Sequence, residues 1–280
     1  MKTRLEKLKA AAKDRVLRLA GLELKAEYVT AAPSAQNAVD IFKGEWTAKL
    51  PAPLQELRAG DAGVFQDPRI AWLGEQLDNP GGLHVLECGP HEGGHTYMLE
   101  QMGVGSILSI EANTHAFLRC LVVKELLQLK RSRFMLGDFV SYLRSAGRHD
   151  LVVACGVLYH LVNPVEAIAL ISKVTNQLYI WTHYYDEQII NSQPILAHHF
   201  RSHSAAEYGG FKHFLHRQHY QTRLGNAGFN GGSAHYSHWI TKEDLLGSLK
   251  CFGFNDITIG YDHARDSIGP NISLMARRTG

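Results

Sequence analysis

The strongest constraint on the fold is a regular alternation of short apolar runs with helical patterns, which begins near residue 83. A segment of helical length and periodicity, HAFLRCLVVKELLQL, separates the second apolar run from the third. Near-continuous apolar strands that alternate with helices are typical of a parallel sheet covered by helices on both faces. The predicted strands are LHVLEC (83–88), SILSIE (106–111), RFMLGD (133–138), DLVVAC (150–155) and QLYIWT (177–182).

The C-terminal part of the chain adds a helix and two more strands. The helix, TKEDLLGSLKCFGF, opens with Thr241 and Asp244 as a capping pair and ends at a glycine. The runs DITIGYD (256–262) and NISLMARR (271–278) follow, and the Gly-Pro turn between them indicates a hairpin. We therefore predict an α/β fold with a doubly wound, mostly parallel, seven-stranded sheet.

Two regions outside this alternation define the predicted domain organisation. We interpret residues 1–80 as an N-terminal helical extension that includes a capping segment. Residues 81–280 form the main α/β domain, into which residues of about 184–240 are inserted as a lid. The order of the segments thus places one appendage before the sheet and one between its fifth strand and the capped helix.

Composition excludes several classes of protein. The chain has 280 residues and a net charge of +2, from 29 basic and 27 acidic side chains, so it lacks the overall charge of a typical nucleic-acid-binding protein. No apolar run approaches the roughly 20 residues of a membrane span, and the N-terminus lacks the pattern of a secretory signal. Widely spaced cysteines in apolar stretches favour reduced thiols and a cytoplasmic location. They are Cys88, Cys120, Cys155 and Cys251.

Charge is nevertheless uneven along the chain. Residues 1–25 contain eight Lys or Arg against three Asp or Glu, a local charge of +5, which leaves −3 for the remainder. Apolar residues at helical spacing predict an amphipathic helix there. We expect it to pack on the domain or on a partner subunit, with a phosphate or membrane-surface contact as the alternative. The apolar positions are Leu5, Leu8, Ala12, Val16 and Leu19.

The loop that follows the first strand, in VLECGPHEGGH (85–95), predicts a bound ligand. Glycines directly after a buried strand allow a tight turn and let a ligand contact the backbone, although a plain strand-to-helix turn is the simpler interpretation. The loop lacks the lysine of a phosphate-binding loop and the spacing of the dinucleotide fingerprint. Glu87 at the strand tip would repel a pyrophosphate, so a ligand with a positive group suits this corner better.

Acidic residues end the next two strands as well. Glu111, 24 residues after Glu87, can accept hydrogen bonds from both hydroxyls of a ribose. Asp138 can accept from an exocyclic amine while Phe139 lies against a flat ring. Taken singly, Glu111 and Asp138 are equally typical of solvated loop acids. On three consecutive strands, the acids predict a site for a cationic group, a ribose diol and an aminopurine, which together describe S-adenosylmethionine.

The motifs around these acids resemble a known family. VLECGPHEGGH, SIEAN, LGDF and DLVVACGVLYHLVNP are similar to the successive motifs of class I S-adenosylmethionine-dependent methyltransferases. The resemblance covers about residues 80–182 and implies a Rossmann-like methyltransferase fold, with the glycine loop at the methionine half of the cofactor. We expect the cofactor to be bound by Glu87, Gly89, Pro90, Gly93, Glu111, Ala112, Asn113, Asp138, Phe139, Gly156 and Trp46.

A narrower resemblance concerns the tRNA wobble-uridine carboxymethyltransferases. These enzymes carry an acid-Trp segment before the domain and a GVLYH sequence after the fourth strand, and DIFKGEWTAKLP and GVLYH of this chain are similar to them. The first of these segments contains Trp46. This aromatic segment either caps the cofactor or packs the N-terminal region, and the sequence favours neither.

Residues just past the fourth and fifth strands are the candidates for catalysis. Ligands of open α/β sheets bind beyond the carboxyl ends of the strands, so Tyr159, His160 and His183 would face the reactive methyl group. A histidine near its ordinary pKa of about 6.5 could accept a proton from the methyl acceptor. His183, oriented by Asp186 or Glu187, is the favoured base. Structural alternatives are a loop-pinning role for His160, a core-edge role for His183 and a cofactor-lining role for Tyr159.

The predicted lid is rich in histidine. Nine of the sixteen histidines lie between His183 and His238. We expect His213, His216 and His219 to share a helical face. Because this segment is poor in the carboxylates that hard divalent cations require, we predict no metal site and a substrate-covering role.

These features predict an S-adenosylmethionine-dependent methyltransferase that acts on a small polar metabolite, by O-methylation of a sugar, nucleotide-linked or natural-product hydroxyl. The alternative is a tRNA wobble-uridine-modifying (carboxy)methyltransferase, which the basic residues 1–25 favour and the mild overall charge disfavours. An alternative of another class is a non-catalytic, cofactor-binding regulatory subunit. The expected partner is a small-molecule substrate; nucleic acid is not favoured, and assembly into a homo-oligomer is a further hypothesis.

Overall fold

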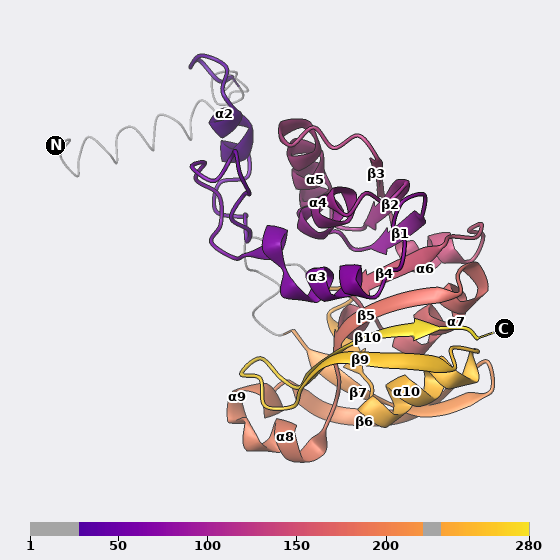
Figure 1. Ribbon diagram of the computed structural model, residues 1–280. Coiled ribbons are helices and arrows are strands. Elements are labelled where there is room, and N and C mark those ends of the chain that lie inside the picture. Colours follow the sequence, from indigo (N-terminus) through magenta and orange to yellow (C-terminus); the bar gives the residue numbers. More distant parts are fainter. Residues whose placement is uncertain (1–27, 221–230, 280) are drawn as a thin grey trace, which may run out of the picture.

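A computed structural model describes residues 28–220 and 231–279 of the chain (Figure 1). The amphipathic helix expected within residues 1–25 lies outside the described residues, so it stays a prediction. In the described ranges no helix is both long enough and apolar enough to cross a membrane.

The centre of the molecule is a seven-stranded sheet with the strand order β3-β2-β1-β4-β5-β10-β9. Strands β1 to β5 run parallel, whereas β10 pairs antiparallel with both β5 and β9. The strands are β1 (His84–Cys88), β2 (Ser106–Glu111), β3 (Ser132–Leu136), β4 (Leu151–Cys155), β5 (Gln177–His183), β9 (Asp256–His263) and β10 (Asn271–Arg277). The predicted fold class, a doubly wound and mostly parallel sheet, is confirmed.

Each strand predicted from the sequence is present, with boundaries shifted by two residues at most. The largest shift is at the end of β3, which stops at Leu136 because Asp138 already caps the next helix. The C-terminal hairpin is also confirmed. At the capped helix α10 (Lys242–Cys251), the Thr241 hydroxyl accepts a hydrogen bond from the backbone amide of Asp244 at 3.0 Å.

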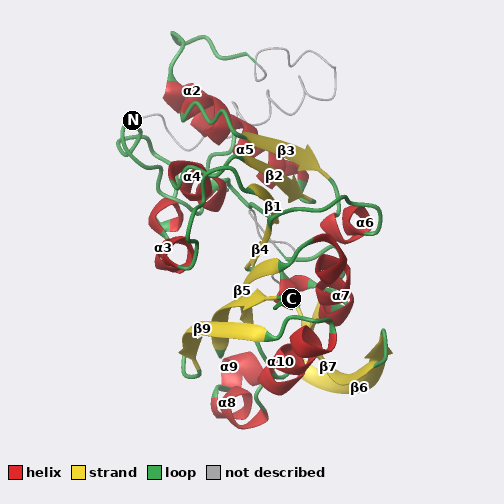
Figure 2. Cartoon of the chain, turned by 45° about the vertical axis from the view of Figure 1, so that its right-hand side comes forward, coloured by secondary structure: helices red, strands yellow, loops and turns green. Residues whose placement is uncertain are grey.

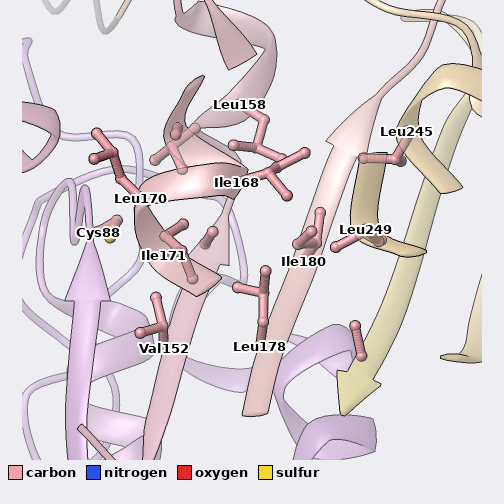
Figure 3. Close-up of a cluster of buried hydrophobic side chains, with 14 of the residues drawn as sticks. Cys88, Val152, Leu158, Ile168, Leu170, Ile171, Leu178, Ile180, Leu245 and Leu249 are labelled. Atoms are coloured by element: carbon pink, nitrogen blue, oxygen red, sulfur yellow. The ribbon is translucent and has the colours of Figure 1, made fainter. Parts of the chain in front are cut away.

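Helices cover both faces of the sheet (Figure 2). On one face, α6, α7 and α10 form the largest apolar cluster with the strands. In Figure 3, Leu178 and Ile180 of β5 lie between Ile168 and Ile171 of α7 and Leu249 of α10. These buried branched side chains remove much apolar surface from water, which is the main source of the sheet's stability. The helices α6 and α7 span Phe139–Leu143 and Pro164–Val174.

The opposite face carries two helices that lead into the candidate site. The helices α3 (Pro68–Glu75) and α4 (Gly94–Gln101) bury a second apolar cluster against the sheet, with Ile70, Leu73 and Leu99 at its centre. A further helix, α5 (Thr114–Leu126), packs against β2 and β3. The N-termini of α3 and α4 therefore meet the carboxyl edge of the sheet from the same side.

The segment before α3 shares a core with α5. Its described residues, from 28 onward, contain a short helix, α2 (Ala35–Asp40), and a 3-10 turn, η2 (Val64–Gln66), joined by loops. Phe42 and Trp46 are buried in a third apolar cluster together with Val123 of α5. This packing ties the segment to the sheet domain.

The inserted region forms a second, three-stranded sheet with the order β6-β7-β8. The expectation of a helical face is wrong: His213, His216 and His219 all lie on strand β7. His216 stacks on Tyr185, with ring centroids 3.7 Å apart. The elements are α8 (Glu187–Ser192), α9 (Pro194–Ala197), β6 (Phe200–Tyr208), β7 (Phe211–His219) and β8 (Tyr236–Trp239).

Candidate active site

The candidate site lies at the carboxyl edge of the sheet, where the strand order changes direction. Strand β1 pairs with β2 on one side and with β4 on the other, so the crossover connections diverge there and leave a crevice for a ligand. Apart from Trp46, the residues predicted from the sequence lie at or just past the C-terminal ends of β1, β2, β3, β4 and β5. The parallel strands therefore bring all of these positions to one edge (Figure 1).

The glycine loop joins β1 to α4 through a backbone that favours glycine. Gly89 has a φ of +68°, and a Cβ atom there would lie 2.5 Å from Cγ1 of Val157. Pro90 is buried, and its carbonyl accepts a hydrogen bond from the amide of Gly93 at 2.8 Å. Gly93, with a φ of +78°, is the N-cap of α4. A turn this tight allows a ligand to contact the backbone closely.

Glu87 lies between α4 and β2. Its side chain is buried and accepts hydrogen bonds from the hydroxyls of Thr96 and Ser109. Burial raises the pKa of this carboxyl group, and Oε1 accepts no hydrogen bond from any described residue. A buried carboxylate oxygen without a donor favours a proton or a positive charge nearby. A role for Glu87 at the methionine half of the cofactor stays a prediction.

Glu111 ends β2, and backbone amides hold both of its oxygens. Oε1 accepts from the amide of Asn113 at 2.8 Å, and Oε2 accepts from the amide of His91 in the glycine loop at 3.0 Å. Burial raises the pKa of the carboxyl group, although these two hydrogen bonds and one from the amide of Ala112 each act to lower it. Ala112 itself is exposed, and Asn113 caps α5. A carboxylate has about four acceptor positions, so capacity remains for a ligand hydroxyl.

Asp138 and Phe139 lie at the start of α6. The Asp138 carboxylate caps this helix by accepting from the amides of Val140 at 3.1 Å and Ser141 at 3.0 Å, and the residue is exposed. Phe139 belongs to the largest core cluster and is 7% exposed. Asp138 is therefore open to a ligand amine, whereas protein already covers most of the Phe139 side chain.

Gly156, Tyr159 and His160 follow β4. Gly156 has a φ of +85°, and the 3-10 turn η3 (Leu158–His160) comes directly after it. Burial lowers the pKa of His160 to about 3 and raises the pKa of the Tyr159 hydroxyl above its ordinary value. Nδ1 of His160 lies 3.1 Å from the hydroxyl of Tyr220. At neutral pH His160 is thus a weak proton acceptor and Tyr159 a weak proton donor.

His183 ends β5 with its tautomer fixed by the backbone. Nδ1 lies 3.2 Å from the carbonyl oxygens of both Gly269 and Pro270. Carbonyl oxygens only accept hydrogen bonds, so Nδ1 carries the proton and Nε2 carries the lone pair. Burial lowers the pKa of the ring, which keeps it neutral at pH 7. Of the two candidate histidines, His183 is the one whose free nitrogen the structure defines.

The prediction that Asp186 or Glu187 orients His183 is wrong. Asp186 caps α8 and accepts from the amide of Ile189 at 3.0 Å, and Glu187 is exposed on the same helix. The antiparallel pairing of β10 with β5 places Asn271 opposite His183, and the turn before β10 therefore supplies the two carbonyl groups. Backbone, not a carboxylate, orients this imidazole.

Aromatic rings from three elements surround His183. Its ring stacks on Trp239 of β8 at 4.9 Å and contacts the edges of Tyr159 at 4.7 Å and Trp181 at 5.1 Å. Trp239 Nε1 is buried and has no hydrogen-bond partner among the described residues. A cavity of about 10 Å³, enough for roughly one water, lies among these rings. The inserted sheet thus reaches the candidate site through Trp239.

Sequence reasoning missed a charged cluster on the same edge. Asp67, the N-cap of α3, lies 2.8 Å from Nε of Arg69 and 2.9 Å from Nε2 of His95. Burial alone would raise the pKa of Asp67, but hydrogen bonds from His95 and Arg69 hold it well below its ordinary value. Burial alone would lower the pKa of His95, but contacts with Cys155 and Asp67 raise it to about 10. Asp67 is therefore ionised and His95 protonated at pH 7.

Arg69 connects this cluster to the aromatic rings. Its guanidinium lies over Trp181, 4.1 Å from the ring centroid, and its side chain is 30% exposed. Its bonds to Asp67 use Nε and Nη2. A partly exposed cation therefore stands beside the candidate site, with Nη1 left for an anionic group.

A second missed cluster ties the glycine loop to the N-terminal segment. Glu92 is fully buried and accepts from the amides of Thr47 at 2.8 Å and Ala48 at 2.9 Å. Buried Arg119 lies 3.4 Å from Glu92 and donates to Glu45 at 3.0 Å. Removing one partner of such a buried pair leaves an uncompensated charge, so the segment and the loop depend on each other.

Trp46 lies within this N-terminal segment. Its side chain is 8% exposed, and Nε1 donates to the carbonyl of Val39 at 2.8 Å. Phe42 contacts its ring edge-on at 6.3 Å. These contacts favour packing over capping, and a contact between Trp46 and the cofactor stays a prediction.

The sequence held only local signals for the missed residues. Asp67 followed by Pro68 is typical of a helix N-terminus, and Glu92 and His95 lie in the glycine loop itself. No pattern in the sequence indicates that the start of α3 meets the carboxyl edge of the sheet. Over the described ranges, the His, Cys, Asp and Glu side chains form no group of three that could hold a metal ion.

Comparisons with known proteins agree with the fold. The chain matches no protein-family model and no curated protein. It is similar to the N-terminal domain of EvdMO1, crystallised in the presence of SAH and D-fucose, with 21% identity and a TM-score of 0.67 over 87% of this chain and 95% of that one. The similarity spans 46% of the full EvdMO1 structure.

Two further solved structures are similar at lower identity. One is magnesium protoporphyrin IX methyltransferase (ChlM) from Synechocystis PCC 6803 with bound SAH, at 16% identity and a TM-score of 0.51 over 76% of this chain and 81% of that one. The other is an S-adenosylmethionine-dependent methyltransferase from Mesorhizobium loti, at 13% identity and a TM-score of 0.51 over 77% of this chain and all of that one. With the strand order above, these similarities show that the chain has the Rossmann-like fold of class I S-adenosylmethionine-dependent methyltransferases.

Proposed function

We propose that the protein is an S-adenosylmethionine-dependent methyltransferase. The observation that carries this proposal is a series of three acids on consecutive strands. Glu87 lies on β1, Glu111 ends β2, and Asp138 comes just past β3. They lie along one edge of a sheet that has the methyltransferase strand order. Carboxylates repel the phosphates of a dinucleotide but accept hydrogen bonds from hydroxyls and amines. This edge therefore suits a nucleoside that carries a sulfonium group.

The cofactor is assigned to this edge group by group. Glu111 would accept from the ribose hydroxyls, and Asp138 would accept from the adenine amine. The glycine loop from Gly89 to Gly93 would contact the methionine part, and Nη1 of Arg69 would pair with its carboxylate. The positive guanidinium of Arg69 suits the negative carboxylate of the methionine part in both charge and planar shape. Arg69 is also partly exposed and already oriented by Asp67.

The proposed acceptor is a hydroxyl of a small polar metabolite, such as a sugar. Tyr159, Trp181, His183 and Trp239 form a wall of rings with hydrogen-bonding edges, which suits a compact polyhydroxylated ligand. The structure of the EvdMO1 domain, solved in the presence of D-fucose, supports the same substrate class.

His183 is proposed as the proton acceptor. S-adenosylmethionine, when bound, supplies an electrophilic methyl group on a positively charged sulfur. Nε2 of His183 would take the proton from the acceptor hydroxyl as that oxygen bonds to the methyl carbon. The carbon–sulfur bond would break in the same step, with S-adenosylhomocysteine as the leaving group. The bonds from Nδ1 to Gly269 and Pro270 hold the ring in place and stabilise the imidazolium that results. Holding both reactants in line can by itself supply roughly 7–11 kcal/mol.

Two measurements test the proposal in sequence. Titration calorimetry should detect binding of S-adenosylmethionine and of S-adenosylhomocysteine to the full chain. Methyl transfer should then be followed with a labelled methyl group and a panel of free sugars, nucleotide-linked sugars and phenols. Absence of binding would contradict the methyltransferase proposal, and transfer to phenols but to no sugar would contradict the substrate class.

A further inference from the structure

The outer edge of strand β6 has no pairing partner in the part of the chain that the structure describes. β6 is the end strand of the inserted sheet and pairs only with β7. Figure 2 shows β6 as the outermost strand of this sheet. An exposed strand edge is a template for pairing with another strand. Its exposed residues are Arg201, Ser202, His203, Ser204, Ala205 and Glu207.

The turn between β6 and β7 determines which backbone groups face outward. The two-residue turn has φ values of +56° at Gly209 and +85° at Gly210, which is typical of a type I′ hairpin. Tyr208 and Phe211, which flank the turn, therefore form a hydrogen-bonded pair, and hydrogen-bonded pairs alternate along the ladder from there. Counting back from Tyr208, the outward N–H and C=O groups belong to His203, Ala205 and Glu207.

We propose that β6 pairs antiparallel with β6 of a second copy of this chain, about a two-fold axis at Ala205. In this register Ala205 lies opposite Ala205 of the second copy. His203 of each copy lies opposite Glu207 of the other. All three outward-facing residues are then paired, and the two inserted sheets become one six-stranded sheet. A closed two-fold contact of this kind uses the same surface on both copies.

Charge complementarity supports this register. An imidazole opposite a carboxylate is a favourable cross-strand pair, and symmetry provides it twice. Shifting the register by one residue, which moves the axis by half a residue, would place the outward groups of one strand against the already bonded groups of the other. The bulge between Phe200 and Ser202 lies outside the paired stretch, so residues 202–208 keep a regular register.

Side chains near the axis support it as well. Ala205 lies opposite Phe214 of β7 in the same sheet, and Phe214 is 50% exposed. In the paired sheet, two small alanines stand between Phe214 of one copy and Phe214 of the other. Each ring can lean over its neighbouring alanine, which covers an apolar side chain that the monomer leaves in water.

Two of the features that usually prevent such pairing are missing from this edge. Proline and lysine are the common protective residues on exposed strands, and β6 contains neither. Nine residues is also long for an unprotected edge strand. A second copy fits this edge better than an unrelated peptide, because only a two-fold axis supplies both complementary charge pairs.

The test compares two substitutions at the axis in the full chain. Ala205→Pro removes an outward N–H and no bond to β7, so it should abolish the dimer while the fold and cofactor binding remain. Ala205→Ser keeps the N–H and should keep the dimer. Sedimentation velocity over a concentration series measures the association, and circular dichroism verifies folding.

A charge exchange tests the register itself. His203→Glu places like charges opposite each other twice, and should weaken the dimer by about tenfold or more. Adding Glu207→His to that variant exchanges the two groups and should restore the wild-type association. Hydrogen exchange should show protection of the amides at 203, 205 and 207 that is lost on dilution to monomer.

Three results would overturn the proposal. The first is a wild-type chain that stays monomeric at its highest soluble concentration. The second is a dimer that Ala205→Pro leaves intact, which would place the interface elsewhere. The third is a His203→Glu defect that Glu207→His does not correct. Binding of a foreign extended peptide to a monomeric chain would show that the edge serves another partner.

Discussion

At the scale of single residues, His183 is the group whose chemistry the fold defines most closely. Two backbone carbonyls hold the proton on Nδ1, and burial keeps the ring neutral at pH 7. We predict that His183→Ala lowers the turnover rate by about 10²–10⁴-fold and leaves cofactor affinity nearly unchanged. Steady-state kinetics and calorimetry measure the two quantities. His160→Ala is the comparator, because a group with a pKa of about 3 is a poor base.

The pH dependence follows from the same assignment. A folded-state pKa below the ordinary 6.5 leaves His183 unprotonated above that pH. Its contribution to turnover should therefore be constant from about pH 6.5 upward and should fall only as the pH drops through the lower folded value. A mutant at 183 that keeps most of its turnover across this range would exclude the residue as the base.

Glu111 determines the second prediction. Replacing it by alanine removes an acceptor for the ribose and the carboxylate that accepts from the amides of His91 and Asn113. Glu111→Ala should weaken S-adenosylmethionine binding by roughly 2–3 kcal/mol, the usual cost of lost charge-assisted hydrogen bonds. Calorimetric titration measures it. Glu125→Ala, which removes an exposed carboxylate near the C-terminal end of α5, is the matched control and should bind as the wild type does.

Arg69 provides the third prediction. If its guanidinium pairs with the methionine carboxylate, the wild-type protein should bind S-adenosylmethionine about tenfold or more tightly than the analogue that lacks this carboxylate. Arg69→Met should bind both compounds with equal, weak affinity. A variant that still discriminates between them would show that the carboxylate lies elsewhere.

Residues on or just past the ends of predicted strands could be placed from the sequence. Glu111 and His183 end apolar runs, and the C-terminal ends of parallel strands all lie at the carboxyl edge of the sheet. Arg69 and Asp67 could not be placed, because they come from a segment whose position depends on packing against the sheet. A local pattern indicates the start of a helix and not what that start faces.

At the scale of elements, the start of α3 is linked to α4 by the Asp67, Arg69 and His95 cluster. The folded-state pKa of His95, about 10, exceeds its ordinary value of 6.5. The stabilisation from its charged form is therefore complete below about pH 6.5 and is lost as the pH rises toward 10. Asp67 has a lowered pKa, so its contribution holds above its ordinary pKa of 3.8 and is lost on acidification.

The fourth prediction follows from these signs. The urea midpoint of unfolding should fall between pH 6.5 and 10 in the wild-type protein, and His95→Gln should reduce this slope. His84→Gln, at an exposed histidine on β1, is the control and should keep the slope. Equal slopes in the wild type and the His95 variant would show that the ion pair does not persist in solution.

The inserted sheet shows why one prediction for an element failed. His213, His216 and His219 repeat every three residues, which fits one face of a helix but alternates between the faces of a strand. The adjacent Gly209-Gly210 pair is a stronger signal, because two glycines between two runs indicate a hairpin. Turn chemistry was the better guide here, since the histidine spacing alone carries no information on hydrogen bonding.

At the scale of the whole molecule, the sheet could be predicted and the attachment of its appendages could not. Seven runs specify seven strands, and the apolar pattern is strongest in β4, β5 and β10, which are buried on both faces of the sheet. The contact of Glu92 with residues 47 and 48 joins parts of the chain that are 45 and 44 residues apart, and no periodic pattern in the sequence indicates it. Such buried ionic contacts depend on the three-dimensional fit of both partners.

The fifth prediction concerns nucleic acid. Residues 1–25 carry a local charge of +5, while the remainder of the chain carries −3, so the sheet domain provides no extended positive surface by charge alone. Binding to tRNA through phosphates releases counterions and falls steeply with salt. We therefore expect no salt-sensitive tRNA binding in a gel-shift titration at low and physiological salt. Submicromolar binding that disappears on deleting residues 1–25 would contradict this expectation, and would favour a tRNA-modifying enzyme over one that methylates a small metabolite.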